Sequence, residues 1–394
     1  MCGIFGRFGC PNPDDLALAK AMGNAVLHRG PDGQGAYFEE LGFVGNTRLA
    51  IIDPVGGDQP FVSHDRQIAV VQNGTIFNYI ELRQKYKSLG YVFKTNCDTE
   101  VILAGYQLLG KDCIHDFNGM FAFAVYDARS RTVHLARDRL GEKPLYLARN
   151  GKDWWFASEI KAISAHVHLD KVSEEAIANY FSFNYVPAPL SIYESVRHVP
   201  PGTWTTLTPE GFEEEKYWSV TRLKQRKWHP EEAKDRLNQI LEDAVRLRTR
   251  ADVPFGAFLS GGIDSSSVVG LMSKVIDSPV QTFCIGFDDP RYDESPYAHL
   301  AAERFGTQHR CEIVSSNLLH SWPKVLWHTD APHGDASFMP TLAVAQIASE
   351  SVKMVLTGDG ADELFAGYDK YAALFAQELG EKDLGGSLSR SLSL

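Results

Sequence analysis

The apolar pattern changes between the two halves of this chain, and the change limits the folds open to it. Up to about residue 200, short apolar runs at 68–72, 120–126, 132–136 and 144–148 are separated by Gly, Asn, Asp and Pro. Runs bounded by turn residues are typical of strands in an antiparallel sheet. Helical spacing at 14–27, 78–89 and 99–109 adds a few helices. This mixture predicts an α+β domain.

The second half alternates strand and helix patterns instead. Strands are expected at 253–259, 280–287, 310–314 and 352–356, with helices at 265–273 and 295–305 and an earlier helix that starts near Pro230. Such alternation predicts a doubly wound α/β domain with a parallel sheet. We therefore expect domains at 1–200 and 230–379, a connector at 201–229, and a low-complexity Ser-, Gly- and Leu-rich tail at 380–394.

Charge and composition exclude several classes of partner. A formal net charge of −11 leaves no basic face for a phosphate backbone, so we expect no nucleic-acid partner. No stretch approaches the roughly 18 apolar residues of a membrane span, and the N-terminus lacks the pattern of a signal peptide. The six scattered cysteines show neither a CxxC pair nor a zinc-like spacing, which indicates reduced thiols in a cytoplasmic protein.

Cys2 is a candidate nucleophile because it lies one methionine cleavage from the start of the chain. Removal of Met1 would leave a thiol and a free α-amine on one residue. Ordinary pKa values of about 8 for the amine and about 8.5 for the thiol let the amine act as the base near neutrality. This is the pairing of N-terminal nucleophile hydrolases, which need no histidine. A cysteine at position 2 also occurs by chance, so the assignment depends on later segments.

Later segments of the first half offer groups that suit a free amino acid. Arg48 and Asp98 can pair with a carboxylate and an ammonium. Asn73 and Gly74 can donate a side-chain amide and a backbone N–H to a tetrahedral oxyanion. The Gly-rich segment 28–35 can cover a small ligand. Taken singly, each has a structural explanation, because Asn-Gly is a turn signal and a lone charge usually lies on the surface.

Together these segments resemble the class II glutamine amidotransferase domain. The strings that carry the resemblance follow the family's order: Cys2-Gly3-Ile4, His28-Arg29-Gly30-Pro31-Asp32, Arg48-Leu49, Asn73-Gly74 and Cys97-Asp98-Thr99-Glu100. The resemblance implies an αββα N-terminal nucleophile fold, attack of the Cys2 thiolate on glutamine, and a γ-glutamyl thioester that is hydrolysed after ammonia leaves. Asn73 and Gly74 would hold the oxyanion. The implied glutamine contacts are Arg48, Leu49, Ile52, Asn73, Gly74, Thr75 and Asp98.

Two positions depart from the family pattern. Thr75 stands where a glutamate usually follows Asn-Gly, and Phe77 replaces a usual tyrosine. That glutamate helps to hold the substrate glutamine, so Thr75 bears on the affinity for glutamine and not on the nucleophile.

A strand-to-helix turn is expected at 258–266, with the sequence Phe-Leu-Ser-Gly-Gly-Ile-Asp-Ser-Ser. Small residues let backbone N–H groups approach phosphate oxygens, and a helix N-terminus favours their negative charge. Asp264 can bind Mg²⁺, which prefers oxygen ligands. The segment lacks GxxxxGK[ST], so it is not a Walker loop. A simple glycine turn would explain Gly-Gly alone, but the full string is much rarer.

This string resembles the PP-loop of ATP pyrophosphatases, which cleave ATP to AMP and pyrophosphate, and residues 355–368 are similar to the asparagine synthase motif. The implied ATP contacts are Leu259, Ser260, Gly261, Gly262, Asp264, Ser265, Ser266, Ile285, Thr357 and Gly358. The resemblance also implies Mg²⁺ ligands at Asp264 and Asp362. The acceptor and its adenylate would lie at Asp335, Asp359 and Glu363.

The order of the two domains resembles that of glutamine-hydrolysing asparagine synthetases. The implied reaction converts aspartate, ATP and glutamine into asparagine, AMP, pyrophosphate and glutamate, through β-aspartyl-AMP and internally transferred ammonia. ATP and Mg²⁺ are the implied cofactors, and a homodimer is the family expectation. Family members continue well beyond Tyr368, so we expect an intact glutaminase site and an incomplete synthetase site.

Other functions fit parts of this pattern. A related PP-loop amidotransferase would amidate a different carboxylate, and a truncated form would retain only glutaminase activity. A phosphosugar-amidating enzyme shares the N-terminal domain, but the segment 260–266 argues against it. A regulatory or binding protein without catalysis is a further alternative, and retention of Met1 in front of Cys2 would favour it.

Overall fold

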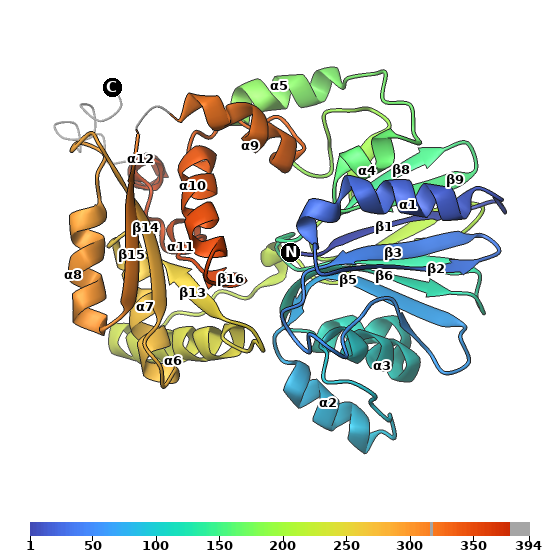
Figure 1. The fold of residues 1–394 in the computed structure, drawn as a ribbon, viewed down its shortest axis with the longest axis horizontal. Coiled ribbons are helices and arrows are strands. Elements are labelled where there is room, and N and C mark those ends of the chain that lie inside the picture. The colour runs from blue at the N-terminus through green and yellow to red at the C-terminus, as the bar shows by residue number, and fades with distance from the viewer. Residues whose placement is uncertain (316–317, 379–394) are drawn as a thin grey trace. The chain divides into compact units, whose positions relative to one another are not determined.

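The computed structural model describes residues 1–315 and 318–378, and Figure 1 shows its fold. The chain forms two compact units. Unit 1 comprises Met1–Asn238, Leu247–Val253 and the described part of Asn317–Leu342. Unit 2 comprises Gln239–Arg246 and the described parts of Pro254–Ser316 and Ala343–Leu394. The predicted tail at 380–394 lies outside the described residues.

Two six-stranded antiparallel sheets form the centre of unit 1 (Figure 1). Sheet A has the order β10-β8-β9-β1-β3-β2 and consists of β1 (Gly3–Phe8), β2 (Gly33–Glu39), β3 (Gly42–Arg48), β8 (Tyr146–Asn150), β9 (Asp153–Ala157) and β10 (Val196–His198). Sheet B has the order β12-β11-β7-β6-β5-β4 and consists of β4 (Phe61–Val62), β5 (Ile68–Ile76), β6 (Gly119–Asp127), β7 (Thr132–Arg137), β11 (Thr203–Leu207) and β12 (Phe212–Lys216).

Helices lie against the outer face of each sheet. On sheet A these are α1 (Asp15–Ala25) and α4 (Ile160–Ser164), and on sheet B they are α2 (Tyr79–Ser88) and α3 (Thr99–Leu109). The predicted helix at 99–109 is confirmed with the same bounds. The other helices that lie wholly in unit 1 are α5 (Glu174–Phe183) and α9 (Trp322–Thr329).

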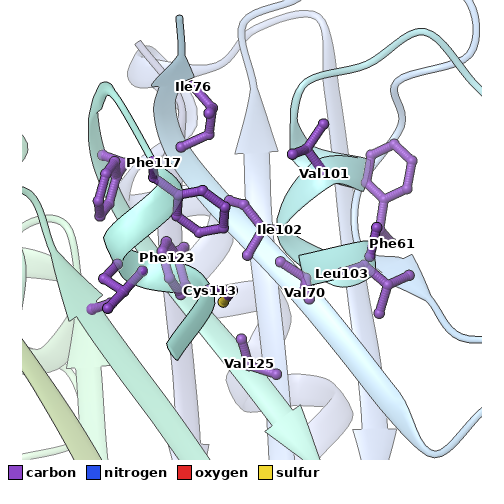
Figure 2. Packing of buried hydrophobic residues seen from close by; sticks show 14 of the residues in the cluster. Phe61, Val70, Ile76, Val101, Ile102, Leu103, Cys113, Phe117, Phe123 and Val125 are labelled. Atoms are coloured by element: carbon purple, nitrogen blue, oxygen red, sulfur yellow. The ribbon is translucent and has the colours of Figure 1, made fainter. Parts of the chain in front are cut away.

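Three apolar cores hold these elements together. Alternation along β1 turns Ile4 toward the space between the sheets, where it joins Val71 in one core, and turns Phe5 toward Met22 of α1 in a second core. A third core joins sheet B to its helices, and Figure 2 shows Ile102 of α3 within it. The order of layers is helix, sheet, sheet, helix. The predicted αββα fold is confirmed.

Sheet B extends into the predicted connector 201–229. β11 pairs with β7, and β12 pairs with β11, so the sheet continues to Lys216. Trp204 of β11 is buried in the core under α3. All five residues of β12 are exposed, so no apolar alternation marked this strand. The prolines at 200 and 201 indicated an irregular segment where the sheet in fact resumes.

Two later segments of the chain pack within unit 1. The guanidinium of Arg250 donates to the Glu81 carboxylate of α2 at 2.6 Å. The Lys161 ammonium lies 3.1 Å from the Asp330 carboxylate, at the end of α9. Unit 1 is therefore completed by residues that follow the first long helix of the second half, α6 (Pro230–Arg248).

A four-stranded parallel sheet forms the centre of unit 2, in the order β15-β14-β13-β16. Its strands are β13 (Phe255–Phe258), β14 (Gln281–Phe287), β15 (Gln308–Val314) and β16 (Met354–Leu356). α7 (Ile263–Val275) and α8 (Ser295–Phe305) pack on one face, and the part of α10 (Phe338–Ser349) that belongs to unit 2 packs on the other. The predicted doubly wound α/β fold is confirmed.

The order of strands reverses at β13. The chain runs outward from β13 to β14 and β15, then returns to place β16 on the other side of β13. The segments that follow β13 and β16 therefore leave the sheet side by side. Open α/β sheets bind ligands at the carboxyl ends of the strands at such a reversal. Here it carries 259–266 and 357–363, which hold most of the predicted ATP contacts.

The helices α11 (Ala361–Phe365) and α12 (Asp369–Glu378) complete the described part of unit 2. Among the helices that the structure describes, none is long and apolar enough to cross a membrane.

Candidate active sites

Cys2 lies just before β1 and is 7% exposed. The backbone N–H of Leu49 donates to its Sγ at 3.3 Å. The Arg29 Nε–H donates to the carbonyl oxygen of Cys2 at 3.0 Å. These contacts hold the thiol against the segment that follows β3. Burial raises the pKa of the Cys2 thiol, so a nucleophilic thiolate needs a neighbouring base.

The N-terminal amine lies in surroundings that suit a base. Burial is the largest cause that lowers its pKa, and the positive charges of Arg29 and Lys143 act in the same direction, which gives a value of about 6. An amine with this pKa is mostly neutral at pH 7 and can accept a proton. This amine belongs to Met1 in the chain as described.

A pocket opens beside Cys2 and collects residues from several distant segments. Its lining consists of Cys2, Arg48, Leu49, Ile51, Ile52, Gln59, Gly74, Thr75, Cys97, Asp98 and Thr99. All predicted glutamine contacts except Asn73 are in this set. The structure therefore brings four of the five predicted segments to one place, and the segment at His28–Asp32 is not in the lining.

The Asp98 carboxylate is buried in this pocket and forms no ion pair among the described residues, although Arg48 lines the same pocket. It accepts a hydrogen bond from the Ile76 backbone N–H at 2.9 Å and a longer one from Gln72 Nε2 at 3.4 Å. Burial outweighs these bonds and raises the pKa of Asp98. A buried carboxylate is unfavourable unless it is paired. The ammonium group of a bound amino acid would supply the missing charge.

Arg48 is buried, but most of its donors are already in use. Its Nη1 donates to the Pro54 carbonyl at 3.0 Å and to the Asp58 carboxylate at 2.9 Å. Its Nη2 donates to the carbonyls of Ile52 at 3.2 Å and Asp53 at 2.7 Å. An arginine carries five N–H groups, so these contacts leave the Nε–H. Binding of a ligand carboxylate by Arg48 requires that group or the exchange of a present bond.

Asn73 and Gly74 lie near the end of β5 under unusual constraints. Gly74 has a φ of +139°, and a Cβ atom there would lie 2.0 Å from the Met120 carbonyl oxygen. Asn73 is fully buried, and its amide oxygen and nitrogen have no hydrogen-bond partner in the described structure. Alternation places it on the same face as Val71, between the two sheets. A buried amide without a partner is a candidate for ligand binding.

Glu159, which sequence reasoning missed, fixes the segment that touches Cys2. Its carboxylate accepts hydrogen bonds from Arg29 Nη1 at 2.7 Å and from Lys161 Nζ at 2.6 Å. Burial alone would raise the pKa of Glu159, but these two cations outweigh it and hold that pKa below its usual range. Arg29 is thereby positioned to bond the Cys2 carbonyl. A glutamate 130 residues away from its partner gives no sequence signal.

In unit 2, the segment after β13 turns back on itself before α7 begins. The hydroxyl oxygens of Ser260 and Ser265 lie 2.9 Å apart, and the Ser260 backbone N–H donates to Ser265 Oγ at 3.2 Å. Gly261 has a φ of +85°, and a Cβ there would lie 2.4 Å from the backbone of Tyr297 on α8. The first backbone N–H groups of α7 have no partner within the helix and are available to an anion.

The segment after β16 packs on the start of α7. A Cβ atom at Gly358 would lie 2.9 Å from the Asp264 Cβ and 2.9 Å from the Ser265 backbone nitrogen. This close approach requires glycine. It brings Gly358, Asp264 and Ser265, which the sequence predicted as ATP contacts from two distant strings, to one point.

The remaining predicted ATP contacts occupy different positions around this point. Leu259 is buried in the core under α7, and the Ser266 hydroxyl is buried without a partner in the described structure. Ile285 lies on β14 and packs toward α10. Thr357 Oγ1 donates to the Asp359 carboxylate at 2.8 Å.

The acidic residues predicted for the acceptor and for Mg²⁺ fall into two groups. Asp359, Asp362 and Glu363 follow β16 and are exposed or half-buried. Glu363 accepts a hydrogen bond from the Tyr368 hydroxyl at 2.9 Å. Asp335 belongs to unit 1 instead, where it accepts the Ser337 backbone N–H at 2.8 Å. Its place near the acceptor stays a prediction.

Family models match both parts of the chain. A glutamine amidotransferase domain matches residues 1–218, and an asparagine synthase domain matches residues 236–393. With the αββα fold and the Cys2 pocket, the first match defines the class, a glutamine amidotransferase joined to a second, synthase domain.

Curated relatives narrow this class. The glutamine-hydrolysing asparagine synthetase 1 of Bacillus subtilis is 35% identical over 376 residues, which cover 94% of this chain and 59% of that protein. A putative asparagine synthetase 2 of Methanocaldococcus jannaschii is 38% identical over 399 residues, with 93% and 76% covered. The chain belongs to the family of glutamine-hydrolysing asparagine synthetases.

Similarity to solved structures is weaker. The glutamine phosphoribosylpyrophosphate amidotransferase of B. subtilis, complexed with ADP and GMP, has a TM-score of 0.42 and 18% identity, with 79% of this chain and 65% of that chain covered. This level of similarity supports no inference about function.

Proposed function

We propose that this chain hydrolyses glutamine at Cys2 and uses the ammonia to convert ATP-activated aspartate into asparagine. One observation carries the proposal: the Cys2 thiol shares its pocket with the buried Asp98 carboxylate, which forms no ion pair in the described structure. A free amino acid brings an ammonium for Asp98 and, in glutamine, a carboxamide for the thiol. The chain spans 59% of the B. subtilis relative, so the full reaction is part of the proposal.

Removal of Met1 would place the α-amine on Cys2 itself. In the surroundings that lower the pKa of the Met1 amine, this Cys2 amine would be neutral and would take the proton of the Cys2 thiol. The thiolate would attack the glutamine carboxamide carbon, and the carbonyl oxygen would become an oxyanion. The Asn73 amide and the Gly74 N–H would donate to that oxyanion. Ammonia would leave with the proton, and water would hydrolyse the γ-glutamyl thioester to glutamate.

The pocket explains how glutamine would be held despite Thr75. Asp98 is the acidic residue of the described lining, so the ligand ammonium depends on it. Thr75 lines the same pocket but brings no charge. We propose that Arg48 binds the ligand carboxylate by giving up one of its present acceptors. Leu49 and Ile52 would complete the contacts through their backbone.

Where the strand order of the parallel sheet reverses, the residues present suit a nucleoside triphosphate. The first backbone N–H groups of α7 are available to phosphate oxygens, and the small residues 260–262 would let these oxygens come near them. Asp264 and Asp362 offer the carboxylate oxygens that Mg²⁺ prefers, and the ion would neutralise the pyrophosphate leaving group. The β-carboxylate of aspartate would attack the α-phosphorus, and ammonia would then displace AMP.

By analogy with the family, we also propose which residues bind the acceptor and how the chain assembles. Asp335, Asp359 and Glu363 would contact aspartate or its adenylate, and the chain would work as a cytoplasmic homodimer. Light scattering on the purified chain measures its mass in solution and tests the dimer.

The decisive experiment incubates the purified chain with glutamine, aspartate and Mg·ATP and quantifies glutamate and asparagine together. Equal increases support both half-reactions. Glutamate alone supports the Cys2 site and argues against aspartate amidation by this chain, and a panel of other carboxylic acids then tests a different acceptor. If neither product forms and intact mass shows that Met1 is absent, the proposal is wrong.

A further inference from the structure

Three side chains of types that commonly bind metals meet on one face of the parallel sheet, and none belongs to the proposed ATP or glutamine sites. Cys284, His309 and Cys311 each offer one ligand atom, and these atoms all lie within 4.8 Å of one another. Cys284 and Cys311 are register partners on the neighbouring strands β14 and β15. His309 precedes Cys311 by two residues, so alternation puts all three on the same face.

The imidazole of His309 is held in the orientation that a metal ligand needs. Its Nε2 lies 3.4 Å from Cys284 Sγ, while its Nδ1 lies 2.9 Å from the Thr282 hydroxyl oxygen. Thr282 is fully buried, and its hydroxyl oxygen also lies 2.8 Å from Thr307 Oγ1. Histidines that bind metals usually use one ring nitrogen and fix the ring through a hydrogen bond to the other.

The spacing of the ligand atoms suits a tetrahedral site. Zinc lies about 2.3 Å from sulfur and about 2.0–2.1 Å from nitrogen, so tetrahedral angles separate neighbouring ligand atoms by roughly 3.4–3.8 Å. The observed 3.4 Å between Nε2 and Cys284 Sγ falls in that range. The three ligand atoms lie at most 4.8 Å apart, so each distance between them would have to shorten by about 1 Å or less when a metal binds.

The chemistry of the three ligands selects the kind of ion. Two sulfur ligands and one imidazole favour Zn²⁺ or Cu⁺, whereas Mg²⁺ prefers oxygen. Such a site is therefore chemically distinct from the proposed carboxylate site of the ATP reaction. Binding would convert the two thiols to thiolates and release their protons to solvent.

Access to the site is open from the edge of the sheet. β15 is the outermost strand on this side, and both Cys311 and His309 are partly exposed, whereas Cys284 is buried. An ion can reach the partly exposed His309 and Cys311 first and then bind the buried thiol of Cys284. The His299 ring on α8 has its centre 5.0 Å from that of His309 but does not belong to the cluster of ligand atoms, so a water would take the fourth position.

We propose that Cys284, His309 and Cys311 form a binding site for a thiophilic metal ion, with Zn²⁺ as the ion to test. The wide sequence separation of the two cysteines hid this site, because the usual zinc signature is a short Cys-x-x-Cys spacing. The strand register brings the ligands together.

The test uses the full reduced chain, stripped of metal by a chelator that is then removed. Titration with Co²⁺ reports thiolate binding through sulfur-to-cobalt charge-transfer absorption, and Zn²⁺ displaces the Co²⁺. One equivalent per chain is expected. The Cys311→Ser variant should lose affinity by at least about 100-fold, since the loss of a ligand exceeds the 10–100-fold effect of second-shell changes. The Cys10→Ser variant, which lacks an exposed thiol outside the cluster, should match the wild type.

Two further measurements separate a specific site from binding by loose thiols. The Thr282→Val variant keeps all three ligands but removes the partner of Nδ1, so its Zn²⁺ affinity should fall by about 10–100-fold. In the wild type, Zn²⁺ should protect Cys311 but not Cys10 from alkylation, as mass spectrometry of the peptides would show. Equal alkylation of Cys311 with and without Zn²⁺, or Co²⁺ bound without charge-transfer absorption, would overturn the proposal even if a variant fails to fold.

Discussion

At Asp98 the folded chain keeps a carboxylate out of water with hydrogen bonds but with no ion pair within the described structure. This arrangement disfavours the charged form, and the pKa of Asp98 is accordingly raised above its value in an unfolded chain. At neutral pH the ionised group therefore destabilises the unliganded protein. Residues poised for a ligand often carry such a penalty.

Replacement of this carboxylate should have opposite effects on stability and binding. Asp98→Asn removes the buried charge, so we expect a higher Tm without ligand, and loss of the rise in Tm that glutamine gives the wild type. Thermal unfolding with and without glutamine measures both. Asp170→Asn, at an exposed position, is the control and should leave both values unchanged. A lower Tm combined with intact glutamine binding would contradict the assignment.

The α-amine makes a prediction about pH. It must be neutral to take the thiol proton, and we expect the surroundings that lower the pKa of the Met1 amine to lower also the pKa of the Cys2 amine that Met1 removal exposes. Glutamine hydrolysis should therefore stay nearly constant as the pH falls from 8 to 7 and decline only at lower pH. The measurement is kcat/KM for glutamine against pH on protein whose Met1 has been removed. A decline that already begins near pH 8, the ordinary value for an α-amine, would show that this environment does not act on the amine.

Motifs in the sequence predicted candidate site residues, but not the partners that hold them. Cys2, Asn73 and Asp98 stand in strings with a recognisable order along the chain. Gln72 and Glu159 have no such string, because their roles arise when β5 meets α3 and when the segment after β9 meets Arg29. The engagement of Arg48 by the carbonyls after β3 was also invisible, since backbone acceptors leave no trace in side-chain identity.

At the scale of elements, the site in unit 2 depends on how closely two strand-to-helix segments approach. We predict that Gly358→Ala pushes the segment after β16 away from the start of α7, because the new Cβ would lie 2.9 Å from Asp264 and Ser265. Overpacking of this kind costs about 1–3 kcal/mol. ATP affinity, measured by calorimetry, should fall.

Gly211→Ala is the matched control for this variant. A Cβ at Gly211 would meet nothing within 4 Å, so neither ATP affinity nor Tm should change. If Gly358→Ala binds ATP as tightly as the wild type, the close approach has no part in nucleotide binding.

Elements with a buried face were predictable, and the element without one was not. β14 and α8 carry clear apolar periods, and the predictions at 280–287 and 295–305 agree with their bounds within one residue. β12 reads Phe-Glu-Glu-Glu-Lys and is exposed throughout, so its pairing with β11 left no periodic signal. The strand order β15-β14-β13-β16 also required the structure, because alternation predicts parallel strands but not their neighbours.

For the whole molecule, the two proposed half-reactions should separate under mutation. Cys2→Ala removes the only nucleophile proposed for glutamine, so glutamate formation should fall to background. Asparagine formation should then require added ammonium chloride, because ammonia enters the second reaction as a free molecule. Cys10→Ser should behave like the wild type in both assays. Glutamine-dependent asparagine formation by Cys2→Ala would contradict the proposed origin of the ammonia.

Unit 1 consists of segments that leave the ribosome at different times during synthesis. The strands of sheets A and B are all translated by residue 216, yet the Lys161 and Asp330 pair forms within the same unit. When only the first family domain has left the ribosome, the surface around Lys161 that later contacts Asp330 is therefore still uncovered. During synthesis chaperones can bind this uncovered surface and proteases can cleave the chain there. Both become less frequent once the later segment has docked.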